Sequence, residues 1–298
     1  MKKITSRRDE FPEWFRQDIP SVQALAKFRS FKQQGVNTVC LEARCPNWAS
    51  CLKKGTLAFM ILGNRCTRNC SFCAVEQSRE KPLPLDRQEP YRILEIIKEW
   101  RLNFVIITSV TRDDLNDYGA GQFVRTINFI HDYKSDIRIE ILIPDFKGAY
   151  LRKVVETRPD VLAHNLETVP RLYPMIRPEA NYQRSLKVIA QARKLASDLI
   201  TKSSLLLGMG EEEKEVIQVM RDLRRAGCDV LVLGQYLSPT PQHYPVKDFI
   251  SLEQFQRYKH KAYRLGFEAI LASPLARTSY QAAQIYDRLK PALKRCVN

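Results

Sequence analysis

No stretch of the sequence is apolar over the roughly 20 residues that a helix needs to cross a bilayer, so no transmembrane segment is expected. The beginning of the chain, MKKITSRRDEFPEWF, is charged and lacks the apolar run of about 7–15 residues found in signal peptides. Internal repeats and low-complexity segments are also missing. These absences predict a cytoplasmic protein with no membrane partner, and 298 residues that are 44% hydrophobic suffice for a sizeable core.

Histidine is scarce, with four residues in the chain, whereas cysteine is clustered. Six of the eight cysteines fall within 34 consecutive residues and form two triplets, C-x4-C-x5-C and C-x3-C-x2-C. The triplets are Cys40, Cys45 and Cys51, then Cys66, Cys70 and Cys73. Because cytoplasmic thiols stay reduced, clustered cysteines of this kind indicate metal ligands or catalysts and not disulfides.

The formal net charge is +15, and it is concentrated at the two ends of the chain. Residues 1–54 and 253–298 each carry a net charge of +6, which leaves +3 for the long middle segment. A basic surface indicates an acidic partner, which could be nucleic acid, an anionic membrane or an acidic protein. The alternative is a solvated basic surface with no partner.

Short apolar runs alternate with amphipathic segments from Thr56 onward. Six of the runs predict strands, at residues 56–62, 104–108, 137–143, 161–165, 203–208 and 229–234. Apolar residues at helical spacing, as at 93–100 and 216–223, predict crossover helices, the second ending near Gly227. Continuous apolar strands joined by helices indicate an α/β protein with a parallel open sheet or barrel.

The two ends of the chain lie outside this alternation. We expect an N-terminal extension (1–55), a core (56–250) and a C-terminal extension (251–298) that form one structural unit. Residues 267–271 are a candidate seventh strand, and 280–293 predict a final helix. Of the two remaining cysteines, Cys228 precedes an apolar strand and is expected in the core, and Cys296 on the surface.

The second triplet directly follows the first predicted strand, at the end of a parallel sheet where active sites gather. Structural zinc sites close four ligands, whereas three thiolates in one loop suit a [4Fe–4S] cluster with one iron left open. A zinc loop or free thiols are the alternatives.

This second triplet, on a loop after a first strand, resembles the radical S-adenosylmethionine superfamily, which implies a partial (β/α)6 TIM-type barrel. In that superfamily the three cysteines hold a [4Fe–4S] cluster whose fourth iron binds S-adenosylmethionine. The resemblance implies that Phe72 lies beside the adenine, with ordinary loop packing as the alternative.

The first triplet and further motifs resemble the lipoyl synthase family along nearly the whole chain. The motifs are TSVTRDDLNDYGAG (108–121), EILIPDF (140–146), HNLETVPRLY (164–173), GMGE (208–211) and GQYLSPTPQHYPV (234–246). The resemblance implies that Cys40, Cys45 and Cys51 hold a second, auxiliary [4Fe–4S] cluster. The family closes that cluster with the second serine of an Arg-Ser-Ser-Tyr motif. This chain reads Arg277-Thr278-Ser279-Tyr280, so Ser279 keeps the ligand position, with a helix N-cap as the alternative role.

The family resemblance implies insertion of two sulfur atoms, at C6 and C8 of an octanoyl group on a lysine of a lipoyl carrier domain or the glycine cleavage H protein. The auxiliary cluster serves as sulfur donor, so Ser279 counts as catalytic. Asn165 and Glu167 follow the fourth predicted strand and are expected to bind the ribose of S-adenosylmethionine, or to form a local loop network. A monomer and an electron donor such as ferredoxin or flavodoxin are expected, with no nucleic-acid partner.

Three polar features stay open at this level. His164 is expected to be structural, and the acidic run 211–213 to begin a helix, where the helix dipole favours it. Arg112, Asp113 and Asp114 could form ion pairs or contact substrate. Two alternative functions are a tRNA methylthiotransferase, for whose additional domains the chain has no room, and a zinc module binding nucleic acid, which leaves the six-strand scaffold unexplained.

Overall fold

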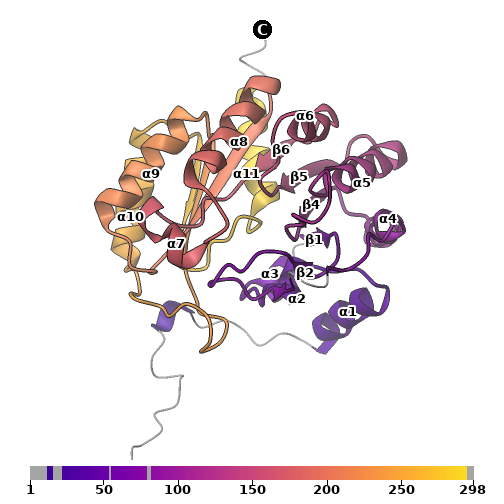
Figure 1. Cartoon of the computed structure of the whole chain (residues 1–298), viewed down its shortest axis with the longest axis horizontal. Coiled ribbons are helices and arrows are strands. Elements are labelled where there is room, and N and C mark those ends of the chain that lie inside the picture. Colours follow the sequence, from indigo (N-terminus) through magenta and orange to yellow (C-terminus); the bar gives the residue numbers. More distant parts are fainter. Residues whose placement is uncertain (1–11, 16–21, 54, 79–81, 294–298) are drawn as a thin grey trace, which may run out of the picture.

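The computed structural model describes residues 12–15, 22–53, 55–78 and 82–293, so Cys296 lies outside the described residues (Figure 1). Its main sheet has seven parallel strands, each hydrogen-bonded to the next in chain order. The strands are β1 (Ala58–Ile61), β4 (Phe104–Ser109), β5 (Arg138–Leu142), β6 (Val161–Ala163), β7 (Ile200–Leu207), β8 (Val230–Gln235) and β9 (Ala269–Ala272). This order confirms the predicted α/β partial barrel, with the candidate seventh strand as its last member.

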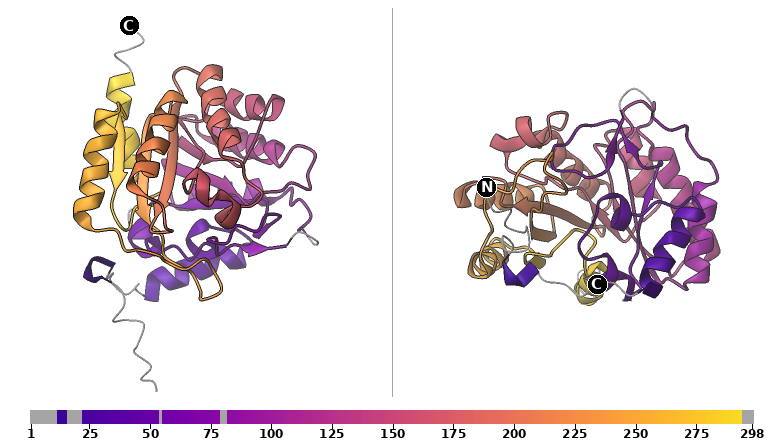
Figure 2. Two further views of the ribbon diagram at one scale, coloured as in Figure 1. Left: turned by 60° about the vertical axis from the view of Figure 1, so that its left-hand side comes forward. Right: turned by 90° about the horizontal axis from the view of Figure 1, so that it is seen from below.

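Helices between the strands cover the outer face of the sheet (Figure 2). They are α4 (Glu89–Glu99), α5 (Ala120–Tyr133), α6 (Ala149–Glu156), α8 (Tyr182–Leu195), α9 (Glu213–Arg225) and α10 (Leu252–Arg264). The shorter or terminal ones are η2 (Glu13–Phe15), α1 (Val22–Gln33), α2 (Val39–Glu42), α3 (Trp48–Lys53), η3 (Pro170–Leu172), α7 (Tyr173–Ile176) and α11 (Ala282–Leu293). Across the described ranges, no helix combines the length and apolar character needed to span a membrane.

Two helix ends follow the sequence signals. Helix α9 begins after Glu212, whose side chain forms a capping box with Glu215, as expected for the acidic run. It ends before Gly227, which has a φ of 84° and therefore adopts the left-handed conformation that glycine tolerates.

Successive side chains of each strand point to opposite faces of the sheet, so the two faces carry different residues. Outward side chains such as Phe59, Ile107 and Ile141 pack in the main core with residues of the covering helices. Inward positions of the same sheet include Thr108 and Ser204, which line a cavity. At the carboxyl ends of the strands, the inner face of the sheet therefore lines the cavity.

Residues 280–293 were predicted to form a final helix, and helix α11 (Ala282–Leu293) confirms it. The helix packs against the apolar half of the inner face of the sheet. Its residues Ile285, Tyr286 and Leu289 form a cluster with Val161 and Ile200. The Tyr286 hydroxyl also donates to Asp160 Oδ1 at 2.7 Å. The C-terminal extension thereby closes the amino-terminal end of the barrel and leaves the carboxyl end for the cavity.

Strand β7 begins at Ile200, earlier than the predicted residue 203, and ends at Leu207. The prediction was late because Thr201 and Lys202 are polar. Lys202 is fully buried, and its Nζ donates to both carboxylate oxygens of Glu140 at 2.9 Å. Burial raises the pKa of Glu140, and the Lys202 charge opposes that rise.

We predict that Lys202→Met lowers the free energy of unfolding by about 3–5 kcal/mol, because it leaves the Glu140 carboxylate buried and unpaired. Combining it with Glu140→Leu should recover most of the loss. Urea denaturation measures the free energy of unfolding of the single and the double variant. The control is Lys98→Met, which breaks an exposed pair with Glu95 and should leave the urea midpoint unchanged. If Lys202→Met lost no more unfolding free energy than Lys98→Met, the buried ion pair would not be needed for stability.

Candidate active site

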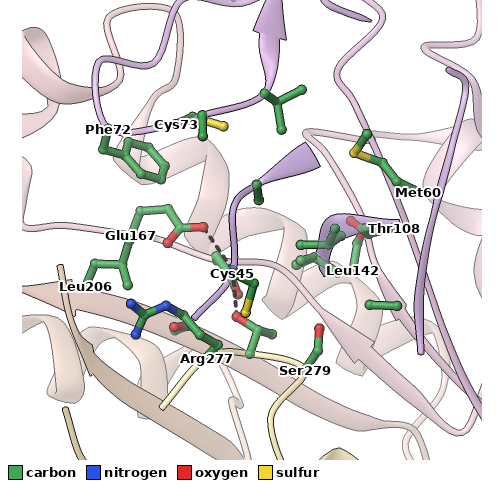
Figure 3. Close-up of a pocket in the computed structure, with 18 of the residues that line it drawn as sticks. Cys45, Met60, Phe72, Cys73, Thr108, Leu142, Glu167, Leu206, Arg277 and Ser279 are labelled. Carbon is green, nitrogen blue, oxygen red and sulfur yellow. Dashed lines mark hydrogen bonds between the residues drawn. The ribbon is translucent and has the colours of Figure 1, made fainter. Parts of the chain in front are cut away.

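Both cysteine triplets reach one cavity of about 530 Å³ at the carboxyl end of the strands. The other predicted site residues, Phe72, Asn165, Glu167 and Ser279, line the same cavity. Figure 3 shows Phe72 beside Cys73, and Glu167 between Phe72 and Arg277. In the same view Cys45 lies between Glu167 and Ser279. Side chains far apart in sequence therefore surround one space.

The loop carrying the second triplet is held from one side by the chain after β4. The backbone N–H of Thr67 donates to Thr111 O at 3.0 Å. The side chain of Arg68 donates to Asp113 at 2.8 Å and to Asp145 at 2.6 Å. Because Arg68 and Asp145 are both buried, this ion pair fixes the loop more firmly than an exposed pair would.

A second contact holds the same loop from the side of β8. The ring Nε2 of His243 donates to Cys73 O at 3.0 Å, and the N–H of Tyr244 donates to Ser71 O at 2.8 Å. Both donors belong to the segment 234–246, which the sequence marked as a motif without a role. That segment braces the cysteine loop.

The first triplet lies on the two short helices that precede the barrel. Cys40 belongs to α2 and Cys51 to α3, with Cys45 in the turn between them. The side-chain amide of Asn47 donates to Leu275 O at 2.5 Å. This bond joins the first triplet to the C-terminal loop that carries Ser279.

The C-terminal loop crosses strand β8 at Gly234. A Cβ atom there would lie 2.0 Å from Ala276 O, so only glycine permits this approach. The loop then delivers Ser279 to the cavity, and α11 begins only at Ala282. Ser279 is therefore not the residue that caps the helix, which removes its alternative role.

All six cysteines are free, and burial raises the pKa of four of them. The pKa of Cys70 is raised to about 11 and that of Cys73 to about 12, and burial also raises the pKa of Cys40 and Cys45. These four thiols are therefore neutral at pH 7, and metal binding would have to displace their protons.

Among the residues that the structure describes, no three His, Cys, Asp or Glu side chains converge closely enough to hold a metal ion.

Polar groups of the loop after β6 form one wall of the cavity, close to Cys73 of the second triplet. The Asn165 amide donates to Glu167 Oε1 at 2.9 Å. Glu167 has a φ of 64°, an uncommon conformation for a residue other than glycine. Burial raises the pKa of Glu167, while the charges of Arg177 and Arg277 oppose the rise. An uncommon backbone conformation and a half-buried carboxylate with a raised pKa make this wall a candidate binding surface.

Arg177 was not predicted from the sequence. Its Nη1 donates to the carbonyl oxygens of Asn165 and Leu166, at 3.1 and 2.8 Å, and its side chain lines the cavity. An arginine in the irregular stretch after a motif carries no distinctive signal. Its role depends on the fold of the loop around it.

The remaining polar residues have structural contacts. His164 is buried, with Nδ1 donating to Ile143 O at 2.9 Å and Nε2 lying 3.5 Å from Asp145 Oδ1, as expected for a structural histidine. Arg112 pairs with Asp114 at 2.7 Å, and Asp113 pairs with Arg68. The ion-pair interpretation of these charged residues is therefore the one that the structure supports.

Comparisons with known proteins agree with this site. The model of the Radical SAM superfamily matches residues 60–223. The chain is 46% identical to a lipoyl synthase of Caldicellulosiruptor saccharolyticus, covering 92% of this chain and 96% of that protein. It is 48% identical to a lipoyl synthase of Geobacter sp. (strain M21), covering 94% and 96%. Its fold resembles the crystal structure of methylornithine synthase, with a TM-score of 0.53 and 19% identity over 71% of this chain and 62% of that one.

The fold, the cysteine loop and the family model define a radical SAM enzyme, which uses S-adenosylmethionine and [4Fe–4S] clusters. Within that superfamily, identity over nearly the whole length shows that the chain belongs to the lipoyl synthase family, whose members insert sulfur. This assignment leaves no support for the tRNA methylthiotransferase and zinc-module alternatives.

We predict that Arg68→Gln weakens retention of iron by the second triplet, because it unpairs Asp113 and the buried Asp145. After anaerobic loading with iron, a chelator should remove iron from the variant faster than from the wild type, and the fast fraction should be about half of the bound iron, since one of two clusters is affected. The matched control is Arg65→Gln, which breaks an exposed pair with Glu76 and should behave as the wild type. Equal rates of iron loss in the two variants would contradict the bracing role of Arg68.

Proposed function

We propose that this cavity carries out sulfur insertion at C6 and C8 of an octanoyl group. The substrate is an octanoylated carrier protein, and we propose a lipoyl carrier domain or the glycine cleavage H protein as that carrier. The observation that supports this most strongly is that both cysteine triplets and Ser279 line one cavity. A sulfur donor and a radical source must flank the same carbon atoms, and a shared cavity meets that requirement.

In this proposal Cys66, Cys70 and Cys73 hold the cluster that binds S-adenosylmethionine. The other three cysteines, together with Ser279, hold the auxiliary cluster. When bound, these groups supply the electron, the hydrogen-abstracting radical and the sulfur, which no side chain of the protein can supply. The chain itself positions them and excludes water.

One part of the cavity wall suits an alkyl chain. Met60, Val110 and Leu142 line it and are buried or half-buried, and Figure 3 shows Met60 and Leu142 across the cavity from Phe72. Apolar walls bind the octanoyl chain by burial and hold its C–H bonds away from water. Phe72, Asn165 and Glu167 are assigned to S-adenosylmethionine, with Phe72 beside the adenine and the polar pair at the ribose.

Ser279 is assigned as the fourth ligand of the auxiliary cluster and as a catalytic residue. Its oxygen is a harder and weaker ligand for iron than a thiolate. Ser279 would hold one iron of the auxiliary cluster less firmly than a cysteine would, which would suit a cluster that serves as a sulfur donor.

The wider arrangement follows from these assignments. Residues 1–55 bring the auxiliary cysteines, 56–250 form the radical core, and 251–298 bring the Arg-Thr-Ser-Tyr motif, within one structural unit. We further propose a cytoplasmic monomer that receives electrons from a ferredoxin or flavodoxin and acts without a nucleic-acid or membrane partner. The basic ends of the chain favour an acidic carrier protein.

Two clusters predict about eight irons per chain after anaerobic loading, with broad absorption near 400 nm. Replacing Cys66, Cys70 and Cys73 together by alanine should leave about half of the iron and abolish cleavage of S-adenosylmethionine. Iron analysis and chromatography of 5′-deoxyadenosine measure these two results. Stoichiometric zinc in place of iron would contradict the proposed function.

Ser279→Ala is expected to spare formation of 5′-deoxyadenosine and to reduce lipoyl product by at least about tenfold, because only the auxiliary cluster loses a ligand. Anaerobic incubation with an octanoyl-lysyl peptide, S-adenosylmethionine and a reductant, followed by mass spectrometry, tests this. Ser279→Cys should hold iron more firmly and slow sulfur transfer. Product formation at the wild-type rate by Ser279→Ala would remove Ser279 from the ligand set.

A further inference from the structure

One hydrogen bond joins the two halves of the cavity directly. The Asn165 amide nitrogen donates to Thr278 Oγ1 at 2.8 Å, in addition to its bond with Glu167. Asn165 belongs to the loop after β6, and Thr278 to the C-terminal loop. Because Thr278 directly precedes Ser279, the bond lies between the residues assigned to S-adenosylmethionine and a ligand assigned to the auxiliary cluster.

The two acceptors determine which atom of Asn165 remains available. Both amide N–H groups point to oxygen atoms, those of Glu167 and Thr278. The carbonyl Oδ1 of Asn165 is buried and has no hydrogen-bond partner among the described residues. Asn165 lines the cavity, and its Oδ1 is an unsatisfied acceptor that a hydroxyl donor would satisfy.

Burial and the branched side chain of Thr278 restrict the orientation of its hydroxyl oxygen in this hydrogen bond. The residue is 7% exposed, and the branched Cβ of threonine restricts its side chain to few rotamers. Its neighbour Arg277 donates to Ala276 O at 2.7 Å and lies near Glu167, whose pKa it helps to hold down. Two consecutive residues of the C-terminal loop thus face the Asn165–Glu167 pair, as Figure 3 shows for Arg277.

We propose that Thr278 is a positioning residue that couples the S-adenosylmethionine site to the auxiliary-cluster site. Its hydroxyl holds the Asn165 amide with the carbonyl oxygen turned to the ligand, and the same bond anchors the backbone that carries Ser279. Because coupling between two sites is reciprocal, binding at either site changes the affinity of the other by the same factor. This proposal rests on the proposed function for the identity of the two ligands. It gives the threonine, where the family has serine, a defined role that depends on its hydroxyl.

The test compares Thr278→Val, which keeps the shape and removes the hydroxyl, with Thr278→Ser, which keeps the hydroxyl. Dissociation constants for S-adenosylmethionine are measured by equilibrium dialysis on the cluster-loaded, unreduced protein. Loss of one buried hydrogen bond predicts affinity roughly three- to tenfold weaker for Thr278→Val, and within about twofold of wild type for Thr278→Ser. The electron paramagnetic resonance signal of the reduced auxiliary cluster should respond to S-adenosylmethionine in the wild type and in Thr278→Ser but not in Thr278→Val.

Two controls separate positioning from general damage. Thr168→Val removes a nearby buried hydroxyl that has no hydrogen-bond partner in the described ranges, and should bind S-adenosylmethionine as the wild type does. In an Asn165→Ala background, Thr278→Val should weaken affinity no further, because the bond is already absent. Wild-type affinity of Thr278→Val, or an equal loss in both backgrounds, would overturn the proposal. A wild type that binds S-adenosylmethionine but forms no lipoyl product would instead refute the proposed function alone.

Discussion

The close approach of the C-terminal loop to strand β8 is the contact on which the site depends. The loop can cross the sheet only where Gly234 leaves room for Ala276 O. That crossing sends Ser279 into the cavity on one side and starts α11 toward the inner face of the barrel on the other. The absence of a side chain at Gly234 therefore permits both the path of the chain to α11 and the position of Ser279, the proposed fourth ligand of the auxiliary cluster.

Three segments that are distant in sequence meet around the cavity through few, specific hydrogen bonds. Asn47 bonds to Leu275 across 228 residues, and Asn165 bonds to Thr278 across 113. Each bond joins a loop carrying proposed ligands to the C-terminal loop. Since these bonds are buried or half-buried, losing one costs more than losing a surface bond, and their geometry is correspondingly well defined.

The fold could be predicted from the sequence because the strands of a covered parallel sheet are continuous apolar runs. The start of β7 could not be predicted, because a lysine is stable in the core only when its charge is paired. The partner of Lys202 is Glu140, 62 residues away in the sequence. The second cysteine triplet was predicted to hold a cluster from its spacing and its place after a strand, and the first from its resemblance to a known family, whereas Arg177 and Asn47 were missed. Their roles come from carbonyl groups of other loops, and no local pattern records such contacts.

The charges that line the cavity fit the groups assigned to it. The charged lining residues are Arg44, Arg68, Arg177, Arg277, Asp145 and Glu167, so cations outnumber carboxylates. Burial lowers the pKa of Arg277, and the neighbouring Cys45 and Glu167 oppose that shift. When metal binding converts neutral thiols to thiolates, negative charge accumulates in this poorly solvated space. The surplus of arginines offsets it, so the cavity that disfavours free thiolates is suited to thiolates that ligate iron.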